Sequence, residues 1–181
     1  MDRYLLIERD GGVNVRTEEG VVSPEKLMIL PFVQEAFFAL HQKKIKTIIL
    51  SDQSAIVPSK IDLSGLDPIH EKMKATVELL GGKVTDVIVN PNSILRVDHS
   101  TFPQSGLFLI AAKKYGLNLQ ETPFIASSYE GLQAGWAAKC RTSFVKTGKP
   151  FKTLQALRTS KVQPEYIFQD LLEAVTRLFP T

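Results

Sequence analysis

The chain contains a single cysteine, Cys140, among its 181 residues. One cysteine excludes an intrachain disulfide and any metal site built from several cysteines. The sequence also lacks a run of about 20 apolar residues, the length needed to cross a bilayer. The apolar stretch at the start of the chain ends at Glu8, too early for the apolar core of a signal peptide. We therefore expect a cytoplasmic protein that does not bind membranes.

An excess of charge of one sign is also missing. The formal net charge is +3, from 22 Lys and Arg against 19 Asp and Glu, and the basic residues are scattered among the acidic ones. A surface that binds nucleic acid gathers its basic residues into a patch, so we expect no nucleic-acid partner. With 44% apolar residues the chain can bury a core, and we place a single domain over residues 1–181.

Short apolar runs alternate along the chain with segments of helical spacing. Five runs are mostly rich in β-branched or aromatic residues and end in polar or glycine-containing segments, as buried strands do. They cover residues 4–7, 47–50, 84–89, 124–126 and 142–145. Apolar residues at helical spacing lie between them, for example Val33, Ala36, Phe37 and Leu40. This alternation predicts an α/β fold with a mainly parallel sheet covered by helices on both faces.

Two helical patterns in the second half of the chain lead to more detailed expectations. Apolar residues at spacings of three and four predict one closing helix over residues 163–179. Trp136 follows Leu132 in another helical pattern, and we expect its side chain to be buried.

The first predicted strand ends in an acidic, glycine-containing segment. Glu8 and Asp10 stand two residues apart and are followed by Gly11 and Gly12. Such a loop can hold a metal and a phosphate, because the glycines let the backbone come close and the acids supply ligands or move protons. An ordinary Asp-Gly turn explains the same residues. Arg9, between the two acids, is expected to be a solvated loop charge.

The second predicted strand ends in Ser51, Asp52 and Gln53. A hydroxyl and backbone N–H groups at the carboxyl edge of a sheet can hold a phosphoryl oxygen. A Ser-Asp pair is equally suited to cap the start of a helix. Both interpretations stay open from these residues alone.

Taken together and in this order, these segments resemble the haloacid-dehalogenase (HAD) phosphatases. Residues 8–14 are similar to the first motif of the family, Asp-x-Asp-Gly-Thr-x-Asn, and residues 51–56 to its second motif in the form Thr-Asn-Gln-Ser-Gly-Ile. That form is typical of the branch of histidinol-phosphate phosphatase and D-glycero-D-manno-heptose 1,7-bisphosphate phosphatase. The resemblance continues in order through residues 115–119, 132–135 and 146–149. It implies a HAD-like Rossmannoid α/β/α domain of three layers without a large cap.

The resemblance also assigns roles to the residues of the first two motifs. Glu8 stands where the family has its nucleophilic Asp, and Asp10 stands at the acid/base position. The extra methylene of Glu8 moves the attacking oxygen by roughly 1 Å, enough to slow the reaction on the order of 100-fold. The residues expected to bind phosphate are Gly11, Ser51, Asp52 and Gln53.

The third and fourth motifs have lost their charged residues. Phe102 stands where the family has the Lys that neutralises the phosphoryl group. Ser127 and Gly131 stand at the two carboxylate positions that hold Mg²⁺, and the adjacent Glu130 would point about 100° away around a helix. We therefore expect no metal site and no cofactor, with Mg²⁺ required only if activity remains.

The zinc loop of the branch is absent as well. Its cysteine and histidine positions hold other residues, and His99 alone cannot bind the ion. The positions are Asn90, Asn92, Asp98 and Ser100.

These losses predict a HAD-fold pseudo-phosphatase that is catalytically inactive and acts as a binding or interaction protein. The alternative is a Mg²⁺-dependent phosphatase of the heptose-bisphosphate or histidinol-phosphate type with weak or altered activity. A third possibility keeps the phosphate-binding residues as an anion sensor. The expected partner is an unidentified protein or a phosphorylated small molecule, and the expected state is a monomer or a weak homodimer.

Overall fold

The computed structural model describes residues 3–53, 61, 63–90 and 101–180. Six strands in these ranges form one sheet in the order β3-β2-β1-β4-β5-β6. Every neighbouring pair is parallel, which confirms the predicted α/β class with a sheet that is parallel throughout. The strands are β1 (Arg3–Glu8), β2 (Ile45–Ser51), β3 (Asp86–Val89), β4 (Pro123–Ala126), β5 (Arg141–Val145) and β6 (Tyr166–Phe168).

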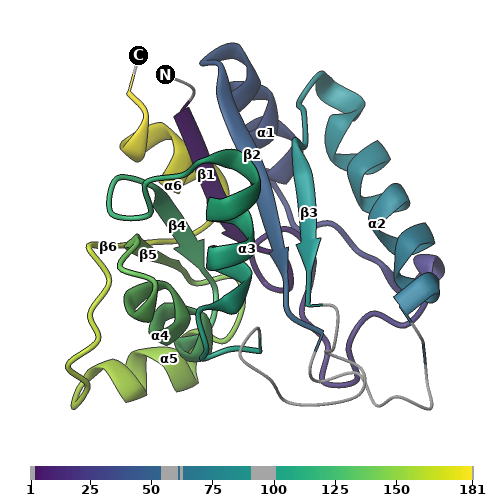
Figure 1. Ribbon diagram of the computed structural model, residues 1–181. Coiled ribbons are helices and arrows are strands. Elements are labelled where there is room, and N and C mark those ends of the chain that lie inside the picture. Colours follow the sequence, from purple (N-terminus) through teal and green to yellow (C-terminus); the bar gives the residue numbers. More distant parts are fainter. Residues whose placement is uncertain (1–2, 54–60, 62, 91–100, 181) are drawn as a thin grey trace.

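Helices cover both faces of this sheet (Figure 1). One face packs against α1 (Val33–Gln42), α2 (Leu63–Val77) and α6 (Leu171–Leu178). The other face packs against α3 (Gly106–Tyr115), α4 (Tyr129–Ala137) and α5 (Pro150–Leu157). Two 3₁₀ turns, Pro24–Lys26 and Glu78–Leu80, complete the described elements. Within the described residues no large cap is added to the three layers.

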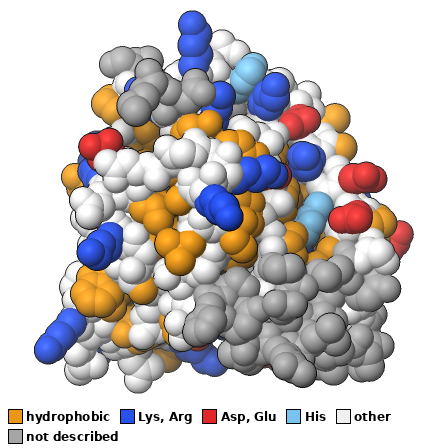
Figure 2. All heavy atoms as spheres, viewed as in Figure 1, with side chains coloured by type: hydrophobic (Ala, Val, Ile, Leu, Met, Phe, Trp, Pro, Cys, Tyr) orange, Lys and Arg blue, Asp and Glu red, His pale blue; other side chains and the backbone are white. Residues whose placement is uncertain are grey.

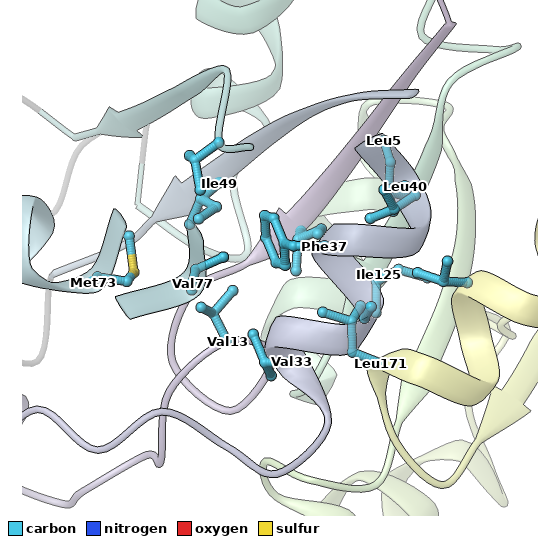
Figure 3. Packing of buried hydrophobic residues seen from close by; sticks show 14 of the residues in the cluster. Leu5, Val13, Val33, Phe37, Leu40, Ile49, Met73, Val77, Ile125 and Leu171 are labelled. Carbon is cyan, nitrogen blue, oxygen red and sulfur yellow. The ribbon is translucent and has the colours of Figure 1, made fainter. Parts of the chain in front are cut away.

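The core follows from the alternation of side chains along each strand. Leu5 and Ile7 of β1 point into the cluster under α1 and α6, whereas Leu6 points into the opposite cluster. Phe37 of α1 is fully buried at the centre of the first cluster, beside Leu40 and Ile49 (Figure 3). Because both faces are covered, the strands are apolar on both sides, and this explains their continuous hydrophobic runs.

Two predictions for the second half of the chain are wrong. Residues 163–179 are not one helix, because Tyr166–Phe168 form the edge strand β6 and the helix begins only at Leu171. Asp170 caps that helix by accepting a hydrogen bond from the backbone N–H of Glu173 at 2.9 Å, a start signal within the predicted span. Trp136 is 57% exposed, since the face of α4 that carries it points away from the sheet.

No helix in the described part of the chain is both long and apolar enough to span a bilayer. On the face shown in Figure 2, lysine and arginine side chains occur scattered across the described surface rather than in one block.

Candidate active site

The carboxyl ends of β1, β2 and β4 meet at one edge of the sheet, because these parallel strands are direct neighbours. The polar segments that follow them therefore converge, as the sequence predicted. They surround a cavity of about 190 Å³. Its walls come from Glu8, Asp10, Arg16, Leu50, Asp52, Phe102, Ser128, Glu130 and Lys149.

Glu8 is almost fully buried and is held from three sides. Its Oε1 accepts hydrogen bonds from Arg16 Nη2 at 2.5 Å and from Ser128 Oγ at 2.7 Å. Its Oε2 accepts a hydrogen bond from the backbone N–H of Ser127 at 2.7 Å. Burial raises the pKa of Glu8 above its usual range, although Arg16 and the two serines act in the opposite direction. Both carboxylate oxygens are thus used in internal contacts.

Asp10 lies in a second set of contacts beside the first. Its Oδ1 accepts hydrogen bonds from Arg9 Nη2 at 2.9 Å and from Asn14 Nδ2 at 2.8 Å. Its Oδ2 accepts one from Gln53 Nε2 at 3.0 Å. Burial opposes ionisation, but the charge and hydrogen bonds of Arg9 outweigh it and hold the pKa of Asp10 below its ordinary value. Asp10 is therefore ionised at neutral pH and can only accept protons.

Arg9 is fully buried, so the expectation of a solvated loop charge is wrong. Its Nη1 lies 3.0 Å from His70 Nε2, and its Nη2 donates to Gln53 Oε1 at 3.2 Å as well as to Asp10. Burial, and next the charge of Arg9, lower the pKa of His70 to about 3. His70 is thus neutral and accepts from the guanidinium. The Arg9 guanidinium can be buried because a carboxylate and a neutral ring both accept hydrogen bonds from it.

Of the residues expected to bind phosphate, Asp52 lines the cavity, and Ser51 and Gln53 lie in this buried network. Ser51 is fully buried, accepts from Gln53 Nε2 at 2.8 Å, and lies 3.2 Å from His70 Nε2. Asp52 lines the cavity and accepts from the backbone N–H of Phe102 at 3.0 Å. Gly11 adopts a positive φ of 91°, which favours glycine. The role of these residues in binding phosphate stays a prediction.

Ser127 and Gly131, which the resemblance matches to the family's metal ligands, fit around Glu8. Ser127 donates its backbone N–H to Glu8 and its hydroxyl to the carbonyl oxygen of Asp10, the latter at 2.8 Å. A Cβ atom at Gly131 would overlap Glu8 Oε2 and lie 3.1 Å from Glu8 Cδ. Any side chain at 131 therefore competes with the Glu8 carboxylate for the same space. Glu130 lines the cavity too, although the helix phase predicted that it would turn away.

Within the described part of the chain, the acidic side chains that line the cavity are not grouped as ligands for one metal ion. Mg²⁺ needs several oxygen ligands in near-octahedral geometry, with carboxylates among them. The described residues contain no group of three or more His, Cys, Asp or Glu side chains arranged to hold a metal. In the zinc loop, Asn90 donates to Thr101 Oγ1 at 2.9 Å, whereas Asn92, Asp98, His99 and Ser100 lie outside the described residues.

Sequence reasoning missed two basic residues of this edge, Arg16 and Lys149, which line the cavity. The tight loop after β1 was the available signal for Arg16, because a Gly-rich turn brings the chain back toward the strand end. Without the structure, the direction of such a long side chain cannot be read from its position in the loop.

Comparison with known proteins identifies relatives over nearly the whole chain. No family model matches. D-glycero-β-D-manno-heptose-1,7-bisphosphate 7-phosphatase from Pseudomonas aeruginosa is 29% identical over 181 residues, covering 98% of this chain and 99% of its own. The protein of the same name from Bordetella bronchiseptica is 28% identical over 152 residues, covering 84% and 85% of the two chains.

Solved structures agree with this relationship. The D,D-heptose 1,7-bisphosphate phosphatase from B. bronchiseptica, complexed with magnesium and phosphate, superposes with a TM-score of 0.88 at 26% identity and covers 97% of each chain. The corresponding enzyme from Burkholderia thailandensis has a TM-score of 0.74 at 25% identity and covers 99% of each chain. The first of these solved relatives was thus determined with magnesium and phosphate bound.

Proposed function

We propose that this chain, which belongs to the HAD-like phosphatases of the D,D-heptose 1,7-bisphosphate phosphatase branch, is a member without hydrolytic activity that acts by binding a partner. The single observation that supports this proposal is the set of contacts around Glu8. Arg16, Ser127 and Ser128 donate hydrogen bonds that occupy both carboxylate oxygens of Glu8, the residue at the nucleophile position.

A carboxylate attacks phosphorus only if an unshared electron pair faces the substrate at close range. Glu8 would have to leave a partly buried ion pair and two further hydrogen bonds before it could attack. Breaking such a set costs several kcal/mol, since removing one partner of a buried pair typically costs about 3–5 kcal/mol. Added to the barrier, about 4 kcal/mol slows the reaction on the order of 1,000-fold.

The charge of the cavity walls indicates which group would bind there. Four acidic residues line the cavity: Glu8, Asp10, Asp52 and Glu130. Two basic side chains, Arg16 and Lys149, line it with them. This balance disfavours a doubly negative phosphate ester and favours a neutral or cationic group. We infer a protein partner that inserts such a side chain, and the small volume of about 190 Å³ fits one side chain better than a bisphosphorylated sugar.

A weak or altered phosphatase is the second candidate, and the relatives favour it. Both curated relatives described above carry the name of a phosphatase, and one solved relative holds magnesium and phosphate. Asp10 is kept at the acid/base position, and the cations Arg16 and Lys149 would attract part of a phosphate ester. The ionised state of Asp10 makes it a base rather than a proton donor.

A turnover assay separates these two candidates. We expect the wild-type protein to release phosphate from D,D-heptose 1,7-bisphosphate, histidinol phosphate and p-nitrophenyl phosphate no faster than buffer, with or without Mg²⁺. Asp10→Asn serves as the matched control, since it removes the charge of Asp10 while keeping its size. Release above background that disappears in Asp10→Asn would establish the phosphatase and reject a purely binding role.

Thermal unfolding tests the phosphate-sensor alternative. We expect inorganic phosphate and sugar phosphates at 10 mM to raise the melting temperature by less than 1 °C, because the cavity walls carry excess negative charge. Binding with a dissociation constant of about 0.1 mM would instead raise it by roughly 5–10 °C. A shift of that size, lost in Lys149→Ala and not accompanied by hydrolysis, would favour the sensor.

A further inference from the structure

Arg16 bridges two oxygen atoms of the segment that follows β1. Its Nη2 lies 2.5 Å from Glu8 Oε1 and 2.7 Å from the backbone carbonyl oxygen of Asp10. The side chain is 24% exposed, so the guanidinium sits at the inner wall of the cavity rather than in open solvent. One cationic nitrogen thus faces a carboxylate and a carbonyl at the same time.

A carboxylate oxygen and a carbonyl oxygen that converge on one point are the ligands that a hard divalent cation uses. Here the point of convergence is occupied by a side chain of the protein itself. A divalent ion at this place would meet the positive charge of Arg16 at contact distance. The two cations therefore exclude each other from these two oxygens.

The other contacts of the Glu8 carboxylate also involve no metal. The Glu8 carboxylate is held on its other side by the backbone N–H of Ser127 and the hydroxyl of Ser128. Gly131 leaves the space that this carboxylate fills, since a Cβ at 131 would overlap Glu8 Oε2. We propose that the Arg16 guanidinium replaces a divalent cation in this site, so that the site is complete without a metal.

Hydrogen bonds within the loop between β1 and α1 fix the position of Arg16. Gly11, with its positive φ, donates its N–H to the carbonyl oxygen of Asn14 at 2.7 Å. Asn14 is fully buried and donates to Asp10 Oδ1, and Val15 donates to the carbonyl oxygen of Met28 at 2.8 Å. The backbone on the N-terminal side of Arg16 is thus anchored, which limits the positions that its side chain can reach.

Titration with Mn²⁺, followed by the electron paramagnetic resonance of the free ion, tests this replacement without reference to activity. We expect the wild-type protein to bind Mn²⁺ with a dissociation constant above about 10 mM. Arg16→Ala and Arg16→Gln are expected to bind it at least tenfold more tightly, because the two oxygens become free. Adding Glu8→Gln to Arg16→Ala should abolish that gain in affinity. Arg158→Ala, which removes an exposed arginine, should bind Mn²⁺ as weakly as wild type.

Three results would overturn the inference: wild-type protein that binds Mn²⁺ as tightly as the Arg16 variants, folded Arg16 variants that gain no affinity, or a gain that survives Glu8→Gln. If neither Arg16 variant folds, the wild-type titration decides alone, since tight binding would refute the replacement and its absence would support it. The inference does not depend on the proposed binding role. A phosphatase that worked without metal would refute that role and leave the replacement intact.

Discussion

Gly131→Asp is expected to destabilise the protein by about 4 kcal/mol, and a second change, Glu8→Asp, is expected to recover about half of that loss. The Cβ of the new side chain would overlap Glu8 Oε2, and its carboxylate would lie beside a second buried carboxylate. Gly131 lies in the first turn of α4, and Ser128 Oγ accepts its N–H at 3.0 Å, so the backbone has little freedom to yield.

Shortening Glu8 by one methylene withdraws its carboxylate from the space next to residue 131. By itself, Glu8→Asp should cost about 2 kcal/mol, because it weakens the contacts with Arg16, Ser127 and Ser128. The double variant should then be more stable than the sum of the single changes predicts, by about 3–4 kcal/mol. Urea unfolding of the four proteins in a double-mutant cycle gives this number directly.

Gln133→Asp is the matched control for this cycle. It places the same charged side chain two residues further along α4, at a half-buried polar position away from Glu8. We expect it to change stability by less than about 1 kcal/mol and to add to Glu8→Asp without interaction. Strict additivity between Gly131→Asp and Glu8→Asp would show that the two positions do not share one space.

The framework of the site could be predicted from the sequence because it depends on periodicity. Strand runs, helix faces and the convergence of strand ends follow from short-range patterns and from the parallel sheet that these patterns require. The two charged motif residues Glu8 and Asp10 do meet at the carboxyl edge. The prediction failed where two local patterns overlap, as at β6, where a three-residue strand precedes a capped helix.

The partners of the charges could not be predicted, for a different reason. Arg9 lies in a loop between two acids, and it was expected to be a solvated charge. The structure turns it inward, because His70, from α2, and Gln53, beyond β2, supply acceptors from distant parts of the chain. Likewise, the neutral residues at 127 and 131 indicated a loss, and the structure adds that Glu8 accepts from the backbone N–H of Ser127 and occupies the space beside Gly131. Only the tertiary fold determines which long side chains meet.

Acidification is expected to destabilise the protein through His70, beginning near pH 6.5. The pKa of this residue is lowered from 6.5 to about 3, chiefly by burial and next by the charge of Arg9. Between these two pH values, His70 is therefore protonated in the unfolded chain and neutral in the folded protein. The stability due to the neutral ring is fully present above pH 6.5 and is lost as the pH falls toward 3. At pH 5 the loss should reach about 2 kcal/mol.

His70→Gln isolates this contribution, because the amide oxygen of Gln can still accept a hydrogen bond from Arg9 and does not titrate. We expect the stability of wild type relative to His70→Gln, measured by urea unfolding, to fall by about 2 kcal/mol between pH 7 and pH 5. The raised pKa of Glu8 and the lowered pKa of Asp10 act in opposite directions and are present in both proteins, so the difference removes most of their effect.

The exposed His41 provides the control, since His41→Gln removes a histidine from the surface and leaves the buried network unchanged. Its stability should follow the wild-type pH dependence. If His70→Gln keeps the full acid sensitivity of wild type, the pKa of His70 is not lowered by folding, and at pH 5 the protonated ring cannot accept from Arg9. At that pH the buried guanidinium would have lost one of its three acceptors, and the ion pair with Asp10 would have to stabilise Arg9 with the help of Gln53 alone.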